Sequence, residues 1–166
     1  MAKQFIVLHG PANSGKTTTL RHVIESLTGI KLPKKPQNWR VVFLYHGLTI
    51  ALSSFGDKPK DIKNNLNFFD GKWKKRITVY YVDLCKEQVT SENQLTSFKF
   101  DVCISACRIE ENMQNVHLLE NYIRSKGVVQ DVQWIYKPRS TSKLQLPLPN
   151  HEDILTAIRI INSINK

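Results

Sequence analysis

Short runs of apolar residues alternate along this chain with longer stretches in which apolar residues recur every three or four positions. The short runs have the length and the β-branched and aromatic content of buried strands, and the longer stretches have the period of amphipathic helices. We predict strands at 5–9, 41–45, 49–54, 77–84, 101–106 and 128–136, and helices at 17–27, 59–69, 110–126 and from residue 150 onward. The polar segment 86–97 is predicted to be a loop or a short helix.

This order of elements predicts a three-layer α/β fold, in which a mostly parallel sheet carries helices on both faces. Only the turn signal His46-Gly47 separates segments 41–45 and 49–54, so we expect them to pair as an antiparallel hairpin. In that hairpin, 41–45 is expected to be an edge strand. A chain of 166 residues has room for one such domain, spanning residues 1–166.

The last predicted helix begins with a capping pair, Asn150 and Asp153. Its apolar positions recur at helical spacing, at Ile154, Leu155, Ile158, Ile161 and Ile164. We expect this apolar face to pack against the sheet.

Eight residues between the first strand and the first helix carry the strongest chemical signal of the chain: Gly10, Pro11, Ala12, Asn13, Ser14, Gly15, Lys16 and Thr17. Two glycines at this spacing, followed by Lys and Thr, are the pattern of a phosphate-binding loop. The glycines allow a tight turn and a close approach of backbone N–H groups to phosphate oxygens. A helix that begins near Lys16 turns its unpaired N–H groups toward the same anion, and we count Thr18 among the binding residues. The alternative is a chance match on a strand–turn–helix segment.

With a strand before it and a helix after it, this octapeptide resembles the phosphate-binding loop of the P-loop NTPase superfamily, over residues 1–27. The resemblance implies a P-loop NTPase fold and a nucleoside triphosphate bound with Mg²⁺. Lys16 is then expected to reach the β- and γ-phosphates, and the Thr17 hydroxyl to ligate Mg²⁺. ATP is expected rather than GTP, because the sequence contains no Asn-Lys-x-Asp element.

A P-loop enzyme usually needs an acidic residue near Mg²⁺, at the end of a strand beside the loop. Two aspartates fit, and both remain open as metal ligands. Asp57 follows the predicted strand 49–54, the next long buried strand after the first helix, and small residues precede it. Asp83 lies near the end of 77–84 and has the better literal match of apolar residues before it. For each, a turn or a surface salt bridge is the alternative role.

Two arginines follow predicted strands on the ligand side of the sheet. Arg108 comes after 101–106 and could contact the γ-phosphate or a phosphoryl acceptor, although a surface role is the alternative. The block Ser54-Phe55-Gly56-Asp57, followed by a helix and by 101–108, is loosely similar to small bacterial or phage P-loop proteins with kinase-like cores. That resemblance implies catalytic roles for Lys16, Asp57 and Arg108, and a contact between Arg139 and adenine.

The net charge of +10 attracts phosphates, whether on nucleotides, on nucleic acid or on an acidic partner. Three stretches hold most of the excess, at 31–40, 58–76 and 137–143, and the second contains a run from Lys72 to Arg76 with Trp73 inside it. Solvated surface lysines are the ordinary explanation of such stretches, and a nucleic-acid or acidic partner bound through the basic surface is the alternative. The aromatic RNA-binding motif is absent from the sequence.

Cysteine content and hydropathy bear on the compartment. Three cysteines, Cys85, Cys103 and Cys107, are too few and too unevenly spaced for a disulfide framework, and a zinc site at the last two lacks further ligands. No apolar stretch approaches the length of about 18 residues that a membrane span needs. The short N-terminal apolar run leads into the glycine loop and does not have the form of a signal peptide. We therefore expect a cytoplasmic protein without a membrane partner.

Two functions from different classes follow. The first is a small ATP-dependent phosphotransferase, similar to nucleoside or nucleotide kinases. The second is an ATP-binding or ATP-hydrolysing switch module that acts on nucleic acid or on a protein partner.

Overall fold

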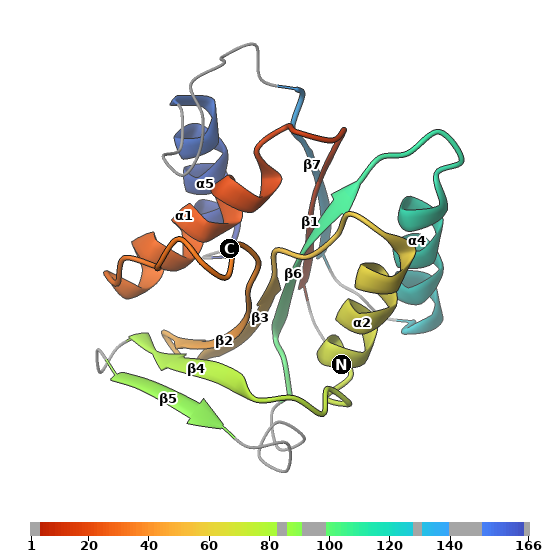
Figure 1. The fold of residues 1–166 in the computed structure, drawn as a ribbon. Helices are drawn as coiled ribbons and strands as arrows, with labels where there is room; N and C mark the ends of the chain where they lie inside the picture. The colour runs from red at the N-terminus through yellow and green to blue at the C-terminus, as the bar shows by residue number, and fades with distance from the viewer. Residues whose placement is uncertain (1–3, 83–85, 91–98, 128–130, 140–150, 165–166) are drawn as a thin grey trace.

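A computed structural model of the chain describes residues 4–82, 86–90, 99–127, 131–139 and 151–164. In chain order its elements are β1 (Gln4–Gly10), α1 (Lys16–Thr28), β2 (Arg40–Tyr45), β3 (Leu48–Ser53), α2 (Pro59–Phe69), β4 (Ile77–Tyr81), β5 (Lys86–Thr90), β6 (Val102–Arg108), α4 (Gln114–Ser125), β7 (Asp131–Tyr136) and α5 (His151–Ile164). Figure 1 shows their arrangement around one twisted sheet. None of the helices in these described ranges is long and apolar enough to cross a membrane.

Within the described residues the sheet has seven strands, in the order β5-β4-β2-β3-β6-β1-β7. The pairs β1–β6, β1–β7, β3–β6 and β2–β4 are parallel, whereas β2–β3 and β4–β5 are antiparallel. The predicted α/β class and mostly parallel sheet are therefore confirmed.

Helices cover both faces of this sheet, with α1 and α5 on one side and α2 and α4 on the other (Figure 1). On β1, Ile6 and Leu8 point into a cluster that includes residues of α1 and α5, such as Leu20 and Ile160. Phe5, the alternate residue on β1, lies in the opposite cluster with residues of α2 and α4. This alternation follows from the two-residue period of a strand, and it makes the architecture three-layered.

The predicted hairpin exists, but its predicted place in the sheet is wrong. His46 and Gly47 have φ values of 47° and 77°, as a tight hairpin turn requires, and β2 pairs with β3 along its full length. However, β2 also pairs with β4, so it is an internal strand. The physical reason is visible in Val41, Val42 and Phe43, which are all buried, because an internal strand covered on both faces needs a continuous apolar run.

The described edge next to β4 is instead formed by β5, which pairs antiparallel with it. The prediction of a loop or a short helix for the segment from Lys86 is therefore wrong for Lys86–Thr90. A polar sequence can form an edge strand, because backbone hydrogen bonds to one neighbouring strand hold it.

The predicted helices 17–27 and 59–69 are confirmed, whereas the next one begins at Gln114 rather than at residue 110. For α5 the predicted face is partly wrong, since Leu155 and Ile158 are 53% and 46% exposed. The buried face instead runs through Asp153, Ala157 and Ile160. Asp153 forms a buried ion pair, which fixes the rotation of the helix, and its predicted capping partner Asn150 lies outside the described residues.

Candidate phosphate-binding site

The carboxyl ends of β1, β3, β6 and β7 meet at one edge of the sheet, because these four strands run in the same direction. Gly10 pairs with Arg108 in the register of β1 and β6. Beyond the strands, the Ile109 N–H donates to the Gly10 carbonyl at 2.8 Å, and the Arg108 N–H donates to the Gly56 carbonyl at 2.8 Å. The loops after β1, β3 and β6 are thereby joined into one surface, which is where ligands bind in sheets of this kind.

The loop between β1 and α1 has the backbone of an anion site. Asn13 and Gly15 have φ values of 59° and 84°, so two residues of the loop are left-handed. Gly15 is the N-cap of α1 and provides no side-chain hydrogen bond to the first turn. The first N–H groups of α1 are thus left to a ligand, and the positive end of the helix dipole favours a negative one.

Close packing explains why positions 10 and 15 of the loop are both glycine. A Cβ on Gly10 would run into the carbonyl oxygen of Lys137, and a Cβ on Gly15 would lie 2.6 Å from Asp153 Oδ1. The first contact is to the residue that follows β7, and the second is to the first turn of α5. The loop therefore packs directly against Lys137 and Asp153.

Lys16, the first residue of α1, is 6% exposed, and it forms no ion pair with a carboxylate among the residues that the structure describes. Its Nζ donates to the carbonyls of Gly10 at 3.1 Å and Pro11 at 2.8 Å, and to Ser14 Oγ at 3.2 Å. Burial lowers the pKa of Lys16 to about 8; Asp57 and Cys107 act to raise it, and Arg108 and Lys137 to lower it further. A buried ammonium held only by neutral acceptors gains from the approach of an anion.

A second buried lysine lies behind the loop, and the sequence analysis missed its role. Lys137 follows β7, is 1% exposed, and forms an ion pair with Asp153 of α5. Thr19 Oγ1 of α1 donates to the same carboxylate at 3.4 Å. The sequence pattern alone does not single out Lys137, and it predicts Asp153 as a capping residue of the last helix. A clue was available in the position of Lys137, directly after a strand that pairs with β1.

Thr17 is bonded to a residue that the sequence analysis did not single out. Its Oγ1 donates to Asn38 Oδ1 at 3.1 Å, and Ser54 Oγ donates to the same oxygen at 3.3 Å. Asn38 therefore connects the start of α1 to the end of β3. The role of Thr17 as a Mg²⁺ ligand stays a prediction, and it requires the hydroxyl to turn from Asn38 toward the metal.

Asp57 and Arg108 lie near Lys16 and act on its charge in opposite ways. Asp57 raises the pKa of Lys16, and Arg108 lowers it. Both residues are held through their backbones by Asn115 of α4. The Asn115 Nδ2 donates to the Asp57 carbonyl at 3.3 Å and to the Arg108 carbonyl at 3.2 Å. The side chain of Asp57 is exposed, so it is free to face a ligand.

A second buried amide, Asn65 of α2, shapes the loop that leads to Asp57. Its Oδ1 accepts from Ser53 Oγ at 2.6 Å and from Arg40 Nε at 3.0 Å. Its Nδ2 donates to the Phe55 carbonyl at 2.8 Å and to Ser105 Oγ at 3.2 Å. With all four bonds made, Asn65 fixes the end of β3 against β2 and β6.

The two remaining predicted site residues are placed differently. Asp83 lies outside the described residues, but β4, the strand before it, is parallel to β2 and therefore runs opposite to β1. The described end of β4 thus lies at the edge of the sheet away from the loop, which favours Asp57 over Asp83. Arg139 is exposed two residues after Lys137, and its contact with adenine stays a prediction.

The residues near the loop fit a phosphate ligand that brings its own metal. Among the described residues, no group of three or more His, Cys, Asp or Glu could hold a metal ion. Thr17 and Asp57 supply one hydroxyl and one carboxylate, which suits Mg²⁺, an ion that takes its other ligands from phosphates and water. Burial raises the pKa of Cys107 to about 12, so this neighbour of Lys16 is a neutral thiol.

Comparisons of the chain with protein-family models, with curated proteins and with solved structures found no match.

Proposed function

We propose that this protein binds ATP with Mg²⁺ at the loop of residues 10–18 and transfers the γ-phosphoryl group to a small acceptor, as a kinase-like phosphotransferase. The observation that carries the proposal is the buried Lys16 ammonium, bonded only to neutral acceptors beside an uncapped helix start. A charged group in that position is stabilised when a phosphate arrives. Thr17 and Asp57 are the proposed metal ligands.

In the proposed reaction, Lys16 and the N–H groups of α1 hold and neutralise the β- and γ-phosphates. Bound Mg²⁺ supplies further neutralisation of the transferring group. Asp57 accepts the proton of the acceptor hydroxyl or holds a metal-bound water, and Arg108 stabilises negative charge on the transferring oxygens. Asn115 holds Asp57 and Arg108 close to each other, because its side-chain amide donates to the backbone carbonyls of both.

The test is to incubate the protein with γ-labelled Mg-ATP and a pool of nucleosides and nucleoside monophosphates, and to separate the products. A labelled acceptor is expected, and Asp57→Asn should reduce its formation at least about tenfold while ATP binding persists. Glu111→Gln is the matched control. Glu111 is also an exposed carboxylate in a loop after a strand, since it lies three residues beyond the end of β6, but no role at the loop is proposed for it. Equal loss in both variants would contradict the role of Asp57.

Labelled inorganic phosphate without a labelled acceptor would support the alternative, an ATP-hydrolysing switch module that acts on nucleic acid or a protein partner. The net charge of +10 favours a polyanionic partner for such a module. Failure to bind Mg-ATP at all would contradict both functions.

A further inference from the structure

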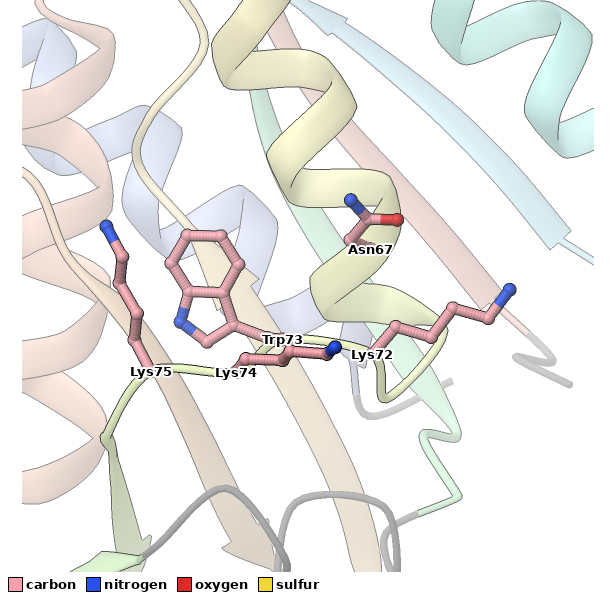
Figure 2. A pocket seen from close by; sticks show the side chains of 5 residues that line it. All are labelled: Asn67, Lys72, Trp73, Lys74 and Lys75. Carbon is pink, nitrogen blue, oxygen red and sulfur yellow. The ribbon is translucent and has the colours of Figure 1, made fainter.

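A cationic pocket lies between the end of α2 and the start of β4, outside the loop that is proposed to bind ATP. Its volume is about 380 Å³, and it is lined by Asn67, Lys72, Trp73, Lys74 and Lys75. Figure 2 shows the indole of Trp73 beside the side chain of Lys75, on the segment that leads from α2 to β4, with the side chain of Lys72 extending away from the ring. The described lining residues include three lysines and no carboxylate, so their electrostatic potential favours an anion.

The indole contacts a half-buried cation, the guanidinium of Arg40, and Lys75 Nζ also lies 5.5 Å from its ring centroid. The guanidinium carbon of Arg40 lies 4.4 Å from the Trp73 ring centroid and 4.0 Å from the Phe55 ring centroid, which makes a sandwich. Arg40 is itself fixed, since its Nε donates to Asn65 Oδ1 at 3.0 Å. Trp73 is half-buried, so part of its ring stays accessible while its orientation is set.

We propose that this pocket binds single-stranded nucleic acid, with one base stacked on Trp73 and the flanking phosphates at Lys72, Lys74 and Lys75. Single strands are recognised by this combination, because unpaired bases offer a flat face for an aromatic ring and the backbone needs cations along it. An acidic peptide would use the lysines but would not offer a flat base to the accessible part of the indole. A duplex would keep its bases away from the ring.

The sandwich also connects the pocket to the loop before Asp57. Phe55 lies two residues before Asp57, and Asn65 bonds both to Arg40 and to the Phe55 carbonyl. Trp73 contacts Arg40, and Arg40 contacts Phe55 of this loop. A base that stacks on Trp73 can therefore shift the loop through these two contacts. We infer that single strands change the rate of ATP turnover, and this second step rests on the proposed function, whereas the binding step does not.

The binding step is tested by fluorescence anisotropy of a labelled oligo(dT) 12-mer at several salt concentrations. Trp73→Leu keeps an apolar side chain but removes the aromatic face, and it is expected to weaken binding roughly 5- to 100-fold. Changing Lys72, Lys74 and Lys75 to Gln should lower the slope of log affinity against log salt by about 2. The matched control is the same change at Lys31, Lys34 and Lys35, which are exposed lysines of another basic stretch.

Equal effects of the two triple variants, or unchanged binding by Trp73→Leu with a wild-type melting curve, would overturn the proposal. So would equal competition by poly-glutamate or by duplex DNA of the same length. Lys16→Met should bind the 12-mer like the wild type, so a failure of the proposed ATP site leaves this result unaffected. For the second step, the 12-mer should change wild-type ATP turnover at least about twofold and Trp73→Leu turnover less; retained binding with unchanged turnover would overturn the connection alone.

Discussion

The two buried lysines beside the start of α1 show how one loop is both supported and left open to a ligand. Lys137, behind the loop, is paired inside the protein with Asp153. Lys16, in the loop itself, is bonded only to two carbonyls and a hydroxyl. The first charge is neutralised by an ion pair within the fold, whereas the second has no such ion pair among the described residues. The only carboxylate among them whose charge acts on it is the more distant Asp57. Burial alone therefore does not identify a ligand-binding lysine, but burial without a carboxylate partner does point to one.

The largest effect is expected when the cation of the buried pair is removed. Lys137→Met takes away the ammonium that pairs with the buried Asp153 carboxylate, and it should lower the free energy of unfolding by about 3–5 kcal/mol. Chemical denaturation measures the loss. The double variant Lys137→Met/Asp153→Leu should recover most of it, and a single variant as stable as the wild type would show that the pair does not support the loop.

The pH dependence of binding tests the unpaired lysine. Because the pKa of Lys16 is lowered to about 8, free protein loses the Lys16 proton above that pH and must regain it to bind an anion. Affinity for Mg-ATP should fall roughly 20-fold between pH 7.5 and 9.5, and binding at pH 8.5 should take up protons. Isothermal titration calorimetry in buffers of different ionisation enthalpy measures the uptake.

The stability of the free protein should follow the opposite course. The folded pKa of Lys16 lies below the unfolded value of about 10.5, so the unfolded state holds this proton over a range where the folded state has lost it. The contribution of Lys16 to the free energy of unfolding is therefore least favourable below about pH 8 and improves as the pH rises toward 10.5.

The control for the binding experiment is Lys16→Arg. This variant should remove the proton uptake on Mg-ATP binding at pH 8.5, and persistence of that uptake would assign it to another group.

A smaller effect is expected from a change of Asn115, whose side chain bonds to residues on the side of the loop where Asp57 lies. Asn115→Ala removes the donor to the Asp57 and Arg108 carbonyls, and it should lower the free energy of unfolding by about 1–2 kcal/mol. Its distinguishing result is kinetic, because misplaced Asp57 and Arg108 should lower kcat more than they raise KM for ATP. An equal change in both constants would indicate a general structural role.

The smallest effect is expected at Asn38. Asn38→Ala frees the Thr17 hydroxyl in the unliganded protein, since Asn38 Oδ1 accepts its hydrogen bond. If Thr17 turns to Mg²⁺ when ATP binds, the variant loses little stability, about 0.5–1.5 kcal/mol, and binds Mg-ATP at least as tightly as the wild type. Mg²⁺-dependent calorimetry measures this, and a tenfold loss of affinity would place Asn38 among the ligand-binding residues instead.

The parts of the fold that could be predicted are those that local sequence determines. The strand, glycine loop and helix from Phe5 to Leu27 depend on neighbouring residues, and so does the turn at His46-Gly47. The position of β2 inside the sheet could not be predicted, because it depends on pairing with β4, more than thirty residues later. The run Val41-Val42-Phe43 was the only local sign of it.

The same division holds for the candidate site. Lys16 and the glycines follow a fixed spacing, so sequence alone brings them together. Asn65 and Asn115 could not be found, because an asparagine on a helix gives no sign that its amide will bond to a strand end 10–58 residues away. The pairing of Lys137 with Asp153 likewise depends on how α5 packs beside α1.

The most direct measurement of the central claim is calorimetric titration of the wild type and of Lys16→Met with Mg-ATP at pH 7.5, together with denaturation of both unliganded proteins. We predict that Lys16→Met keeps its free energy of unfolding within about 1 kcal/mol of the wild type, because it removes a buried charge that forms no ion pair among the described residues, and that it loses at least about 100-fold in affinity for Mg-ATP. Wild-type affinity in Lys16→Met would contradict the claim, as would an absence of Mg-ATP binding to the folded wild type.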